Sequence, residues 1–378
     1  MSAPVSPSAT EKISFLRALL GKQELPDISV VMAQWAVHNE LGPMAYFRYN
    51  ETADAASKKI LRQAYMNSAV MDMKFCAAYA EIKKIFDEAQ IDYVPLKGMG
   101  LVRQGIYQNG ALRQHCDIDL LLRTPEECVR ASQLLQDMQW RFAGDINNYH
   151  HLPPLFKNGI MLEIHHLLPG VRSSEVTAHF WNVDFARQDG SCEYWLSAEM
   201  HWAVLFAHIA INHDWDNGAK FLADAGMLMK SSGFDREKCF SYCRKMGISM
   251  PENLLTAFPE IFDTEGDIAR FAVLRDYVLS DKTPVEVLLM NCGKPGSWRW
   301  WRKRLGGFRL SWLRQKYNLP DASRWQMLNV MRKDYWRKIC KGFKYMFAFS
   351  SAEKRVQTSK LTSELLGIGA ENEVFKHI

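Results

Sequence analysis

Hydrophobic positions divide the chain into a helical beginning, a central stretch of short strands and helices, and a second helical part. Residues 11–90 carry apolar side chains at helical spacing, and residues 55–89 form one long amphipathic run without proline or glycine, which predicts a long helix. Residues 1–10 are small, polar and proline-containing, so we expect them to be disordered. After Pro169 the apolar positions return to helical spacing through about residue 280.

The central segment 91–168 changes to short apolar runs separated by turn residues. A helix is expected at 98–107, and another begins at Thr124, because Thr, Pro125 and two glutamates in sequence are typical of a capped helix start. The segment therefore predicts an α+β fold, with a small mixed sheet flanked by N-terminal and C-terminal helical regions. The expected strands are 91–96, 117–122 and 160–166, with weaker ones at 140–143 and 151–156.

A chain of 378 residues exceeds one ordinary hydrophobic core, so several packed units are expected. The pattern predicts these segments: a disordered N-terminus at 1–10, an N-terminal helical region at 11–90, an α/β core at 91–168, a helical domain closing the cleft at 169–293, and a basic, aromatic-rich helical tail at 294–378.

Basic charge is concentrated in the tail. Residues 294–344 hold 15 lysines and arginines against 2 acidic residues, whereas the whole chain has 47 basic and 42 acidic residues. Tryptophan and phenylalanine are interleaved with this charge, which suits an anionic membrane surface, nucleic acid, or a helical cap on the core with solvated basic faces. The cap is the default interpretation. Of the two binding functions, the membrane surface is favoured over nucleic acid because large apolar residues are so dense.

The N-terminus lacks a basic segment followed by an apolar run, which argues against a signal peptide. The longest apolar stretch, 202–211, is too short to span a bilayer. We therefore expect a cytoplasmic protein, which the basic tail would place peripherally at the inner membrane surface.

Two predicted strands carry carboxylates among apolar neighbours. Asp117 and Asp119 are two residues apart, so they share one face of a strand while Ile118 lies on the other. A cation between them would relieve their repulsion, and hard divalent ions such as Mg²⁺ take carboxylate oxygens as ligands. Glu163 lies on a second strand with apolar residues on both sides. An isolated Asp-x-Asp is a weak signal, as a second one at 214–216 shows, so the strand context carries the hypothesis.

Lys97 and Gly98 end one predicted strand and open a helix. Glycine at such a turn lets backbone amides approach a phosphate, and Lys97 can add a point charge. The alternative is an ordinary turn glycine beside a solvated lysine. Arg113 lies in a loop at the mouth of the predicted sheet, where it can pair with a carboxylate or hold a phosphate.

Three pieces of the central segment, VPLKG, ALRQHCDIDLLL and MLEIHH, occur in an order that resembles the bacterial family of uncharacterised nucleotidyltransferases. That family is a branch of the polymerase-beta-like nucleotidyltransferase superfamily. The later stretch LFAHIAINHDWDNGAKFLADAGMLM is also similar to it. The resemblance implies a nucleotidyltransferase-like core in which Asp117, Asp119 and Glu163 bind Mg²⁺ or Mn²⁺. Either Glu163 or His165 would deprotonate the acceptor hydroxyl.

The strand-to-helix turn differs from the Gly-Ser turn of the wider superfamily, since it reads Lys97-Gly98-Met99-Gly100, a form that the narrower family shares. The resemblance implies an NTP donor and leaves the acceptor unidentified. The favoured function is a metal-dependent transfer of a nucleotidyl group to an acceptor hydroxyl or phosphate. The alternative is a non-catalytic nucleotide- or anion-binding protein that docks through its basic tail. The intact set of Asp117, Asp119 and Glu163 favours the enzyme.

Overall fold

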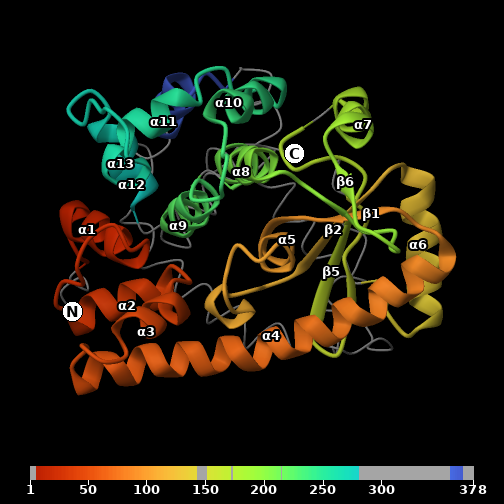
Figure 1. The fold of residues 1–378 in the computed structure, drawn as a ribbon, viewed down its shortest axis with the longest axis horizontal. Helices are drawn as coiled ribbons and strands as arrows, with labels where there is room; N and C mark the ends of the chain where they lie inside the picture. The colour runs from red at the N-terminus through yellow and green to blue at the C-terminus, as the bar shows by residue number, and fades with distance from the viewer. Residues whose placement is uncertain (1–5, 143–150, 172, 214, 281–357, 369–378) are drawn as a thin grey trace, which may run out of the picture.

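The computed structural model describes residues 6–142, 151–171, 173–213, 215–280 and 358–368 of the chain. Three short helices open it and lie together beside one end of a much longer helix (Figure 1). The first begins at Ala9 rather than at Glu11, because Ser8 and Glu11 form a reciprocal capping box. The three are α1 (Ala9–Leu19), α2 (Val30–His38) and α3 (Gly42–Tyr49).

The long helix α4 (Ala55–Ala89) has the bounds that the sequence pattern predicts. Asp54 caps its N-terminus by accepting hydrogen bonds from two backbone amides. Its beginning packs on α2 and α3, and further along it contacts α6 (Pro125–Asp137) and β5 (Ile160–His165). Leu61 accordingly belongs to one hydrophobic cluster, built largely from helices, and Phe75 to another beneath the sheet.

Strands from the central segment form a mixed sheet, which confirms the predicted α+β class. In the described part of the chain, five strands lie in the order β1-β2-β5-β4-β3. β1 and β2 are antiparallel, β2 and β5 are parallel, and β4 pairs antiparallel with both β5 and β3. The strands are β1 (Tyr93–Pro95), β2 (Ile118–Leu122), β3 (Arg141–Phe142), β4 (Leu155–Lys157) and β5.

The two faces of the sheet differ in chemistry. One face packs Ile118, Leu120 and Leu162 against α4 and α6, and these side chains are fully buried. α6 begins where the sequence predicts, with the Thr124 side chain accepting from a first-turn amide. The opposite face lies toward α5 (Lys97–Arg103), which contacts β1, β2 and α8 (Ala198–Ala207). Because strand side chains alternate, that second face receives Asp119.

Beyond β5 the chain is mainly helical, as predicted, with one exception. A small antiparallel hairpin joins β6 (Ala186–Arg187) to β7 (Tyr194–Trp195) through a turn in which Gly190 has a φ of +67°. The Asp-Gly pair in this turn is a hairpin signal, which marks where the prediction of continuous helix was wrong. The helical elements are α7 (Ser174–Val183), α8, a π-helical segment (His208–Asn212), α9 (Gly218–Leu228), α10 (Arg236–Lys245), α11 (Glu252–Ala257), α12 (Pro259–Phe262), α13 (Ala272–Val278) and an unlabelled helix at 358–365.

Most of the basic tail, residues 294–357 and 369–378, lies outside the described residues. Its docking on a membrane surface, and the peripheral location that this implies, therefore stay predictions. In the parts of the chain that the structure does describe, no helix combines the length and the apolar character needed to cross a membrane.

Candidate functional site

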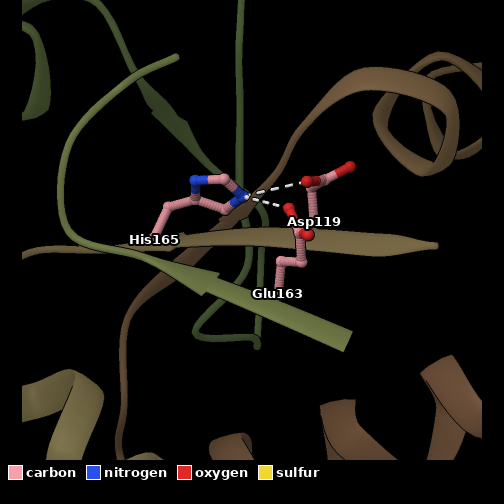
Figure 2. Close-up of side chains that lie close together, drawn as sticks. All are labelled: Asp119, Glu163 and His165. Carbon is pink, nitrogen blue, oxygen red and sulfur yellow. Dashed lines mark hydrogen bonds and ion pairs between the residues drawn. The ribbon is translucent and has the colours of Figure 1, made fainter. Parts of the chain in front are cut away.

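The pairing register of β2 and β5 brings the candidate site together. Asp119 lies directly opposite Glu163, and Leu121 lies opposite His165. Because the two strands are parallel and their side chains alternate, Asp119, Glu163 and His165 share one face of the sheet. Figure 2 shows the three side chains converging, with the imidazole of His165 directed at both carboxylates.

The three side chains form a compact group of potential metal ligands. His165 donates from Nε2 to Oδ1 of Asp119 at 2.9 Å and lies 3.5 Å from Oε2 of Glu163. One ligand atom from each residue can be chosen so that all lie within 4.8 Å of one another. Asp119 and His165 are buried, whereas the Glu163 side chain keeps 17% of its surface exposed. Solvent and ligands therefore reach the group from the side of Glu163.

Lys97 reaches the same carboxylates from the turn after β1. Its Nζ lies 2.7 Å from Oδ1 of Asp119 and 4.0 Å from Oε2 of Glu163. The backbone amide of Leu96 donates to the Asp119 carbonyl at 2.9 Å, which brings the turn against β2. Lys97 has a φ of +48°, an uncommon conformation for a residue with a side chain. Its carbonyl oxygen accepts a hydrogen bond from Nε2 of the fully buried His201 at 3.1 Å.

Electrostatics in the group are dominated by burial and by these contacts. Burial opposes the charge of Asp119, but the Lys97 ammonium and the His165 hydrogen bond hold the pKa of this carboxyl well below its usual range. Burial also opposes a charged imidazole, yet the hydrogen bonds to Asp119 and Glu163 raise the pKa of His165. For Asp117, burial and the neighbouring Asp119 charge raise the pKa to about 7, against the opposing effect of Lys97. A metal ion bound here would therefore compete with the Lys97 ammonium and with the protons held by His165 and Asp117.

The donor set fits a divalent ion. Two carboxylates and one imidazole suit ions such as Mn²⁺, and Mg²⁺ favours the oxygens among them. The expected ligands were Asp117, Asp119 and Glu163. The structure brings Asp119 and Glu163 together with His165, and half-buried Asp117 stands immediately before β2, beside this group rather than within it. The nearby Asp117 carboxylate is a further oxygen at the edge of the site.

Comparison with known proteins decides the family. The model of a family described as uncharacterised nucleotidyltransferase matches residues 31–262, which is more than half of the chain. The chain belongs to this nucleotidyltransferase family. The match includes both strands of the site and the turn that carries Lys97. No curated protein and no solved structure matches the chain.

In this family member, Arg113 is held by a buried carboxylate. Its Nε lies 3.1 Å from both carboxylate oxygens of Asp224, and its Nη2 lies 2.9 Å from Oδ2. Tyr107 also donates to Asp224. Of the two roles that the sequence allows for Arg113, the structure shows the carboxylate pair.

Gly98 has a packing reason in addition to its proposed phosphate role. A Cβ on Gly98 would lie 2.9 Å from Nδ1 of His115 and 3.0 Å from Nη1 of Arg113. The glycine therefore allows the Lys97 turn and the loop before β2 to touch. This contact also places the Arg113 guanidinium next to the turn.

Several residues around the candidate site escaped sequence reasoning. His201 on α8 anchors the Lys97 carbonyl from 104 positions away. Lys220 on α9 pairs with Glu40 and donates to the Gln114 carbonyl at 3.2 Å, which ties the N-terminal helices to the loop before β2. No local spacing signals such partners, because each pair joins segments that are far apart in the sequence.

Proposed function

We propose that this family member is a metal-dependent nucleotidyltransferase that moves a nucleotidyl group from an NTP to an acceptor hydroxyl or phosphate. The observation that carries the proposal is the convergence of Asp119, Glu163 and His165 on one face of the sheet, next to a lysine. The acceptor is left open.

Each residue receives a role from its position. Asp119 and Glu163 would hold the ion, with His165 or Asp117 completing its ligands, and the ion would supply stabilisation for the charge that develops on the phosphates. Where Asp117 completes the ligands, His165 orients Asp119 through its 2.9 Å hydrogen bond, because an Nε2 that carries this proton cannot also bind the ion. Lys97 would bind donor phosphates as a point charge.

Glu163 is the better candidate to accept the proton of the acceptor. Its side chain is partly exposed, whereas His165 is fully buried and directed at both carboxylates. Among the described residues, the ion pairs of Glu163 use Oε2, so we assign proton transfer to Oε1. A general base has to reach the hydroxyl that it deprotonates, and exposure at the mouth of the group allows this.

Gly98 and Arg113 complete the proposed phosphate side. Gly98 carries no side chain of its own over the turn, and the Arg113 guanidinium packs directly against it. The ion pair with Asp224 fixes the guanidinium in position, so Arg113 would contribute its charge without a change of partner. This arrangement would compensate for the hydroxyl that the turn lacks.

Thermal unfolding with each NTP tests the proposal. We expect one nucleotide, together with Mg²⁺ or Mn²⁺, to raise the melting temperature, because a ligand at about 100 times its Kd stabilises the fold by about 2.7 kcal/mol. Asp119→Asn should abolish the metal-dependent part. Asp137→Asn, which removes an exposed carboxylate at the end of α6, should keep it.

Pyrophosphate release from the same NTP, measured with a cell extract as the source of the acceptor, then separates transfer from binding. Release by the wild type and its loss in Asp119→Asn support the enzyme. A metal-dependent shift without release would favour the non-catalytic nucleotide-binding alternative. No shift with any nucleotide would contradict an NTP donor.

A further inference from the structure

The Lys97 ammonium lies where a cation between the two strands is expected. It is close to Oδ1 of Asp119, the same oxygen that accepts from His165, and it also faces Glu163. With only 12% of its side chain exposed, Lys97 is largely shielded from solvent in this position. One carboxylate oxygen thus already serves two donors, and a metal ion bound to it would compete with the ammonium for the same lone pairs and the same space.

We propose that Lys97 is the resident cation of this site, and that a divalent ion replaces its ammonium between Asp119 and Glu163 and releases it toward the donor phosphates. This inference rests on the proposed function. An ammonium and a divalent ion bound to the same Asp119 oxygen would repel each other strongly in a buried setting. Binding of the ion and movement of the Lys97 ammonium toward the phosphates would then occur together.

The backbone around Lys97 is held so that the side chain is the part that moves. His201 binds the Lys97 carbonyl. The next turn packs so closely on β1 that a Cβ on Gly100 would lie 2.5 Å from the Pro95 carbonyl oxygen. The flexible stem of a lysine lets its head group turn without moving the backbone. The adjacent Gly98 and the Arg113 guanidinium define the side to which the released ammonium turns, since both border the proposed phosphate position.

Amine labelling of the full wild-type chain tests the displacement. We expect Mn²⁺ alone, at about ten times its Kd, to raise the acetylation rate of Lys97 to about nine tenths of the rate of a released lysine, because about nine tenths of the sites then hold the ion. Lys220 is the matched control. Its side chain is 13% exposed and paired with Glu40 rather than with a carboxylate of the metal group, so its rate should not change.

A binding measurement with Mn²⁺ provides a second arm. Free Mn²⁺, followed by its electron paramagnetic resonance, should show about tenfold tighter binding to Lys97→Met than to wild type, because no ammonium has to be displaced. Lys97→Arg should not bind more tightly than wild type, because it retains the positive charge.

The outcomes separate this inference from the proposed function. One outcome would overturn the displacement and leave the nucleotidyltransferase proposal standing. In it, Mn²⁺ binds to the wild type and not to Asp119→Asn, while Lys97 stays as protected from acetylation as Lys220. Equal or weaker Mn²⁺ binding by Lys97→Met would overturn it as well. An absence of Mn²⁺ binding in both wild type and Lys97→Met, with or without nucleotide, would overturn the displacement together with the metal-dependent function.

Discussion

Removal of the Asp224 charge is the perturbation that best tests how the loop before β2 is held. Asp224→Asn keeps the shape of the side chain but leaves the guanidinium of Arg113 without its counter-charge. Both side chains are nearly buried, with 11% of Arg113 and 3% of Asp224 exposed. The guanidinium therefore cannot regain much hydration when its partner becomes neutral, and the folded state carries the cost.

The expected cost is about 3 kcal/mol. Loss of one partner of a buried ion pair typically costs about 3–5 kcal/mol. Contacts of 2.9 and 3.1 Å place the pair at close range, and Coulomb's law with an effective dielectric constant of about 20 gives about 4 kcal/mol at about 4 Å. The low end is appropriate, because Arg113 also donates to the Gln114 carbonyl at 2.7 Å and keeps that bond.

Urea denaturation of four proteins measures this energy as a double-mutant cycle. The cycle comprises wild type, Asp224→Asn, Arg113→Met and the double variant, and we expect a coupling energy of about 2–3 kcal/mol. Asp263→Asn is the matched control, because Asp263 pairs with Lys22 at 2.6 Å but is 70% exposed. An exposed pair of this kind contributes less than about 1 kcal/mol.

A coupling energy below about 0.5 kcal/mol, the usual error of additivity, would refute the reasoning. The same holds if Asp224→Asn costs no more than Asp263→Asn. Arg113 would then be loosely held, and a role as a mobile phosphate ligand would replace the fixed position assigned to it here.

Three further outcomes follow from the same contacts. Gly100→Ala should lower the free energy of unfolding by about 3 kcal/mol, because its Cβ presses on the Pro95 carbonyl. Gly98→Ala should cost less, about 2 kcal/mol, because its Cβ would meet the side chains of His115 and Arg113 rather than backbone; equal losses in urea denaturation would contradict this ranking. Burial lowers the pKa of His201 from 6.5 to about 4, so the folded state resists its protonation. We expect about 3 kcal/mol of stability to be lost as pH falls from about 6.5 to about 4, and His201→Gln should flatten that slope in denaturation curves.

The elements that local patterns determine could be predicted well from the sequence. α4 has its expected bounds because an uninterrupted helical period needs no tertiary partner to be recognised. α6 begins at its predicted cap for the same reason, since Thr124 acts on its own first turn. Strand alternation also sufficed to place Asp119 opposite the apolar face that contains Ile118.

The partners of the site residues could not be predicted, because they depend on packing between distant segments. The sequence predicts that Lys97 binds a phosphate. The pairing of β1 with β2 places its ammonium against the Asp119 carboxylate. Whether Arg113 met a carboxylate or a phosphate depended on where α9 places Asp224. Neither the separation in sequence nor the residue type specifies these partners. The strand register and the helix packing have to be known before the partners can be identified.

The long helix α4 also has a mechanical consequence. A helix of 35 residues measures about 50 Å, and this one is shared by both hydrophobic clusters. It has no proline or glycine at which helices usually kink, so it is a stiff connection between the two hydrophobic clusters. A movement of the elements around one cluster relative to those around the other therefore needs a hinge outside α4. The π-helical segment His208–Asn212 is an irregular stretch of helix that can serve as such a hinge. It follows directly on α8, whose His201 binds the Lys97 carbonyl. A hinge movement there would therefore displace the residue that holds the Lys97 backbone.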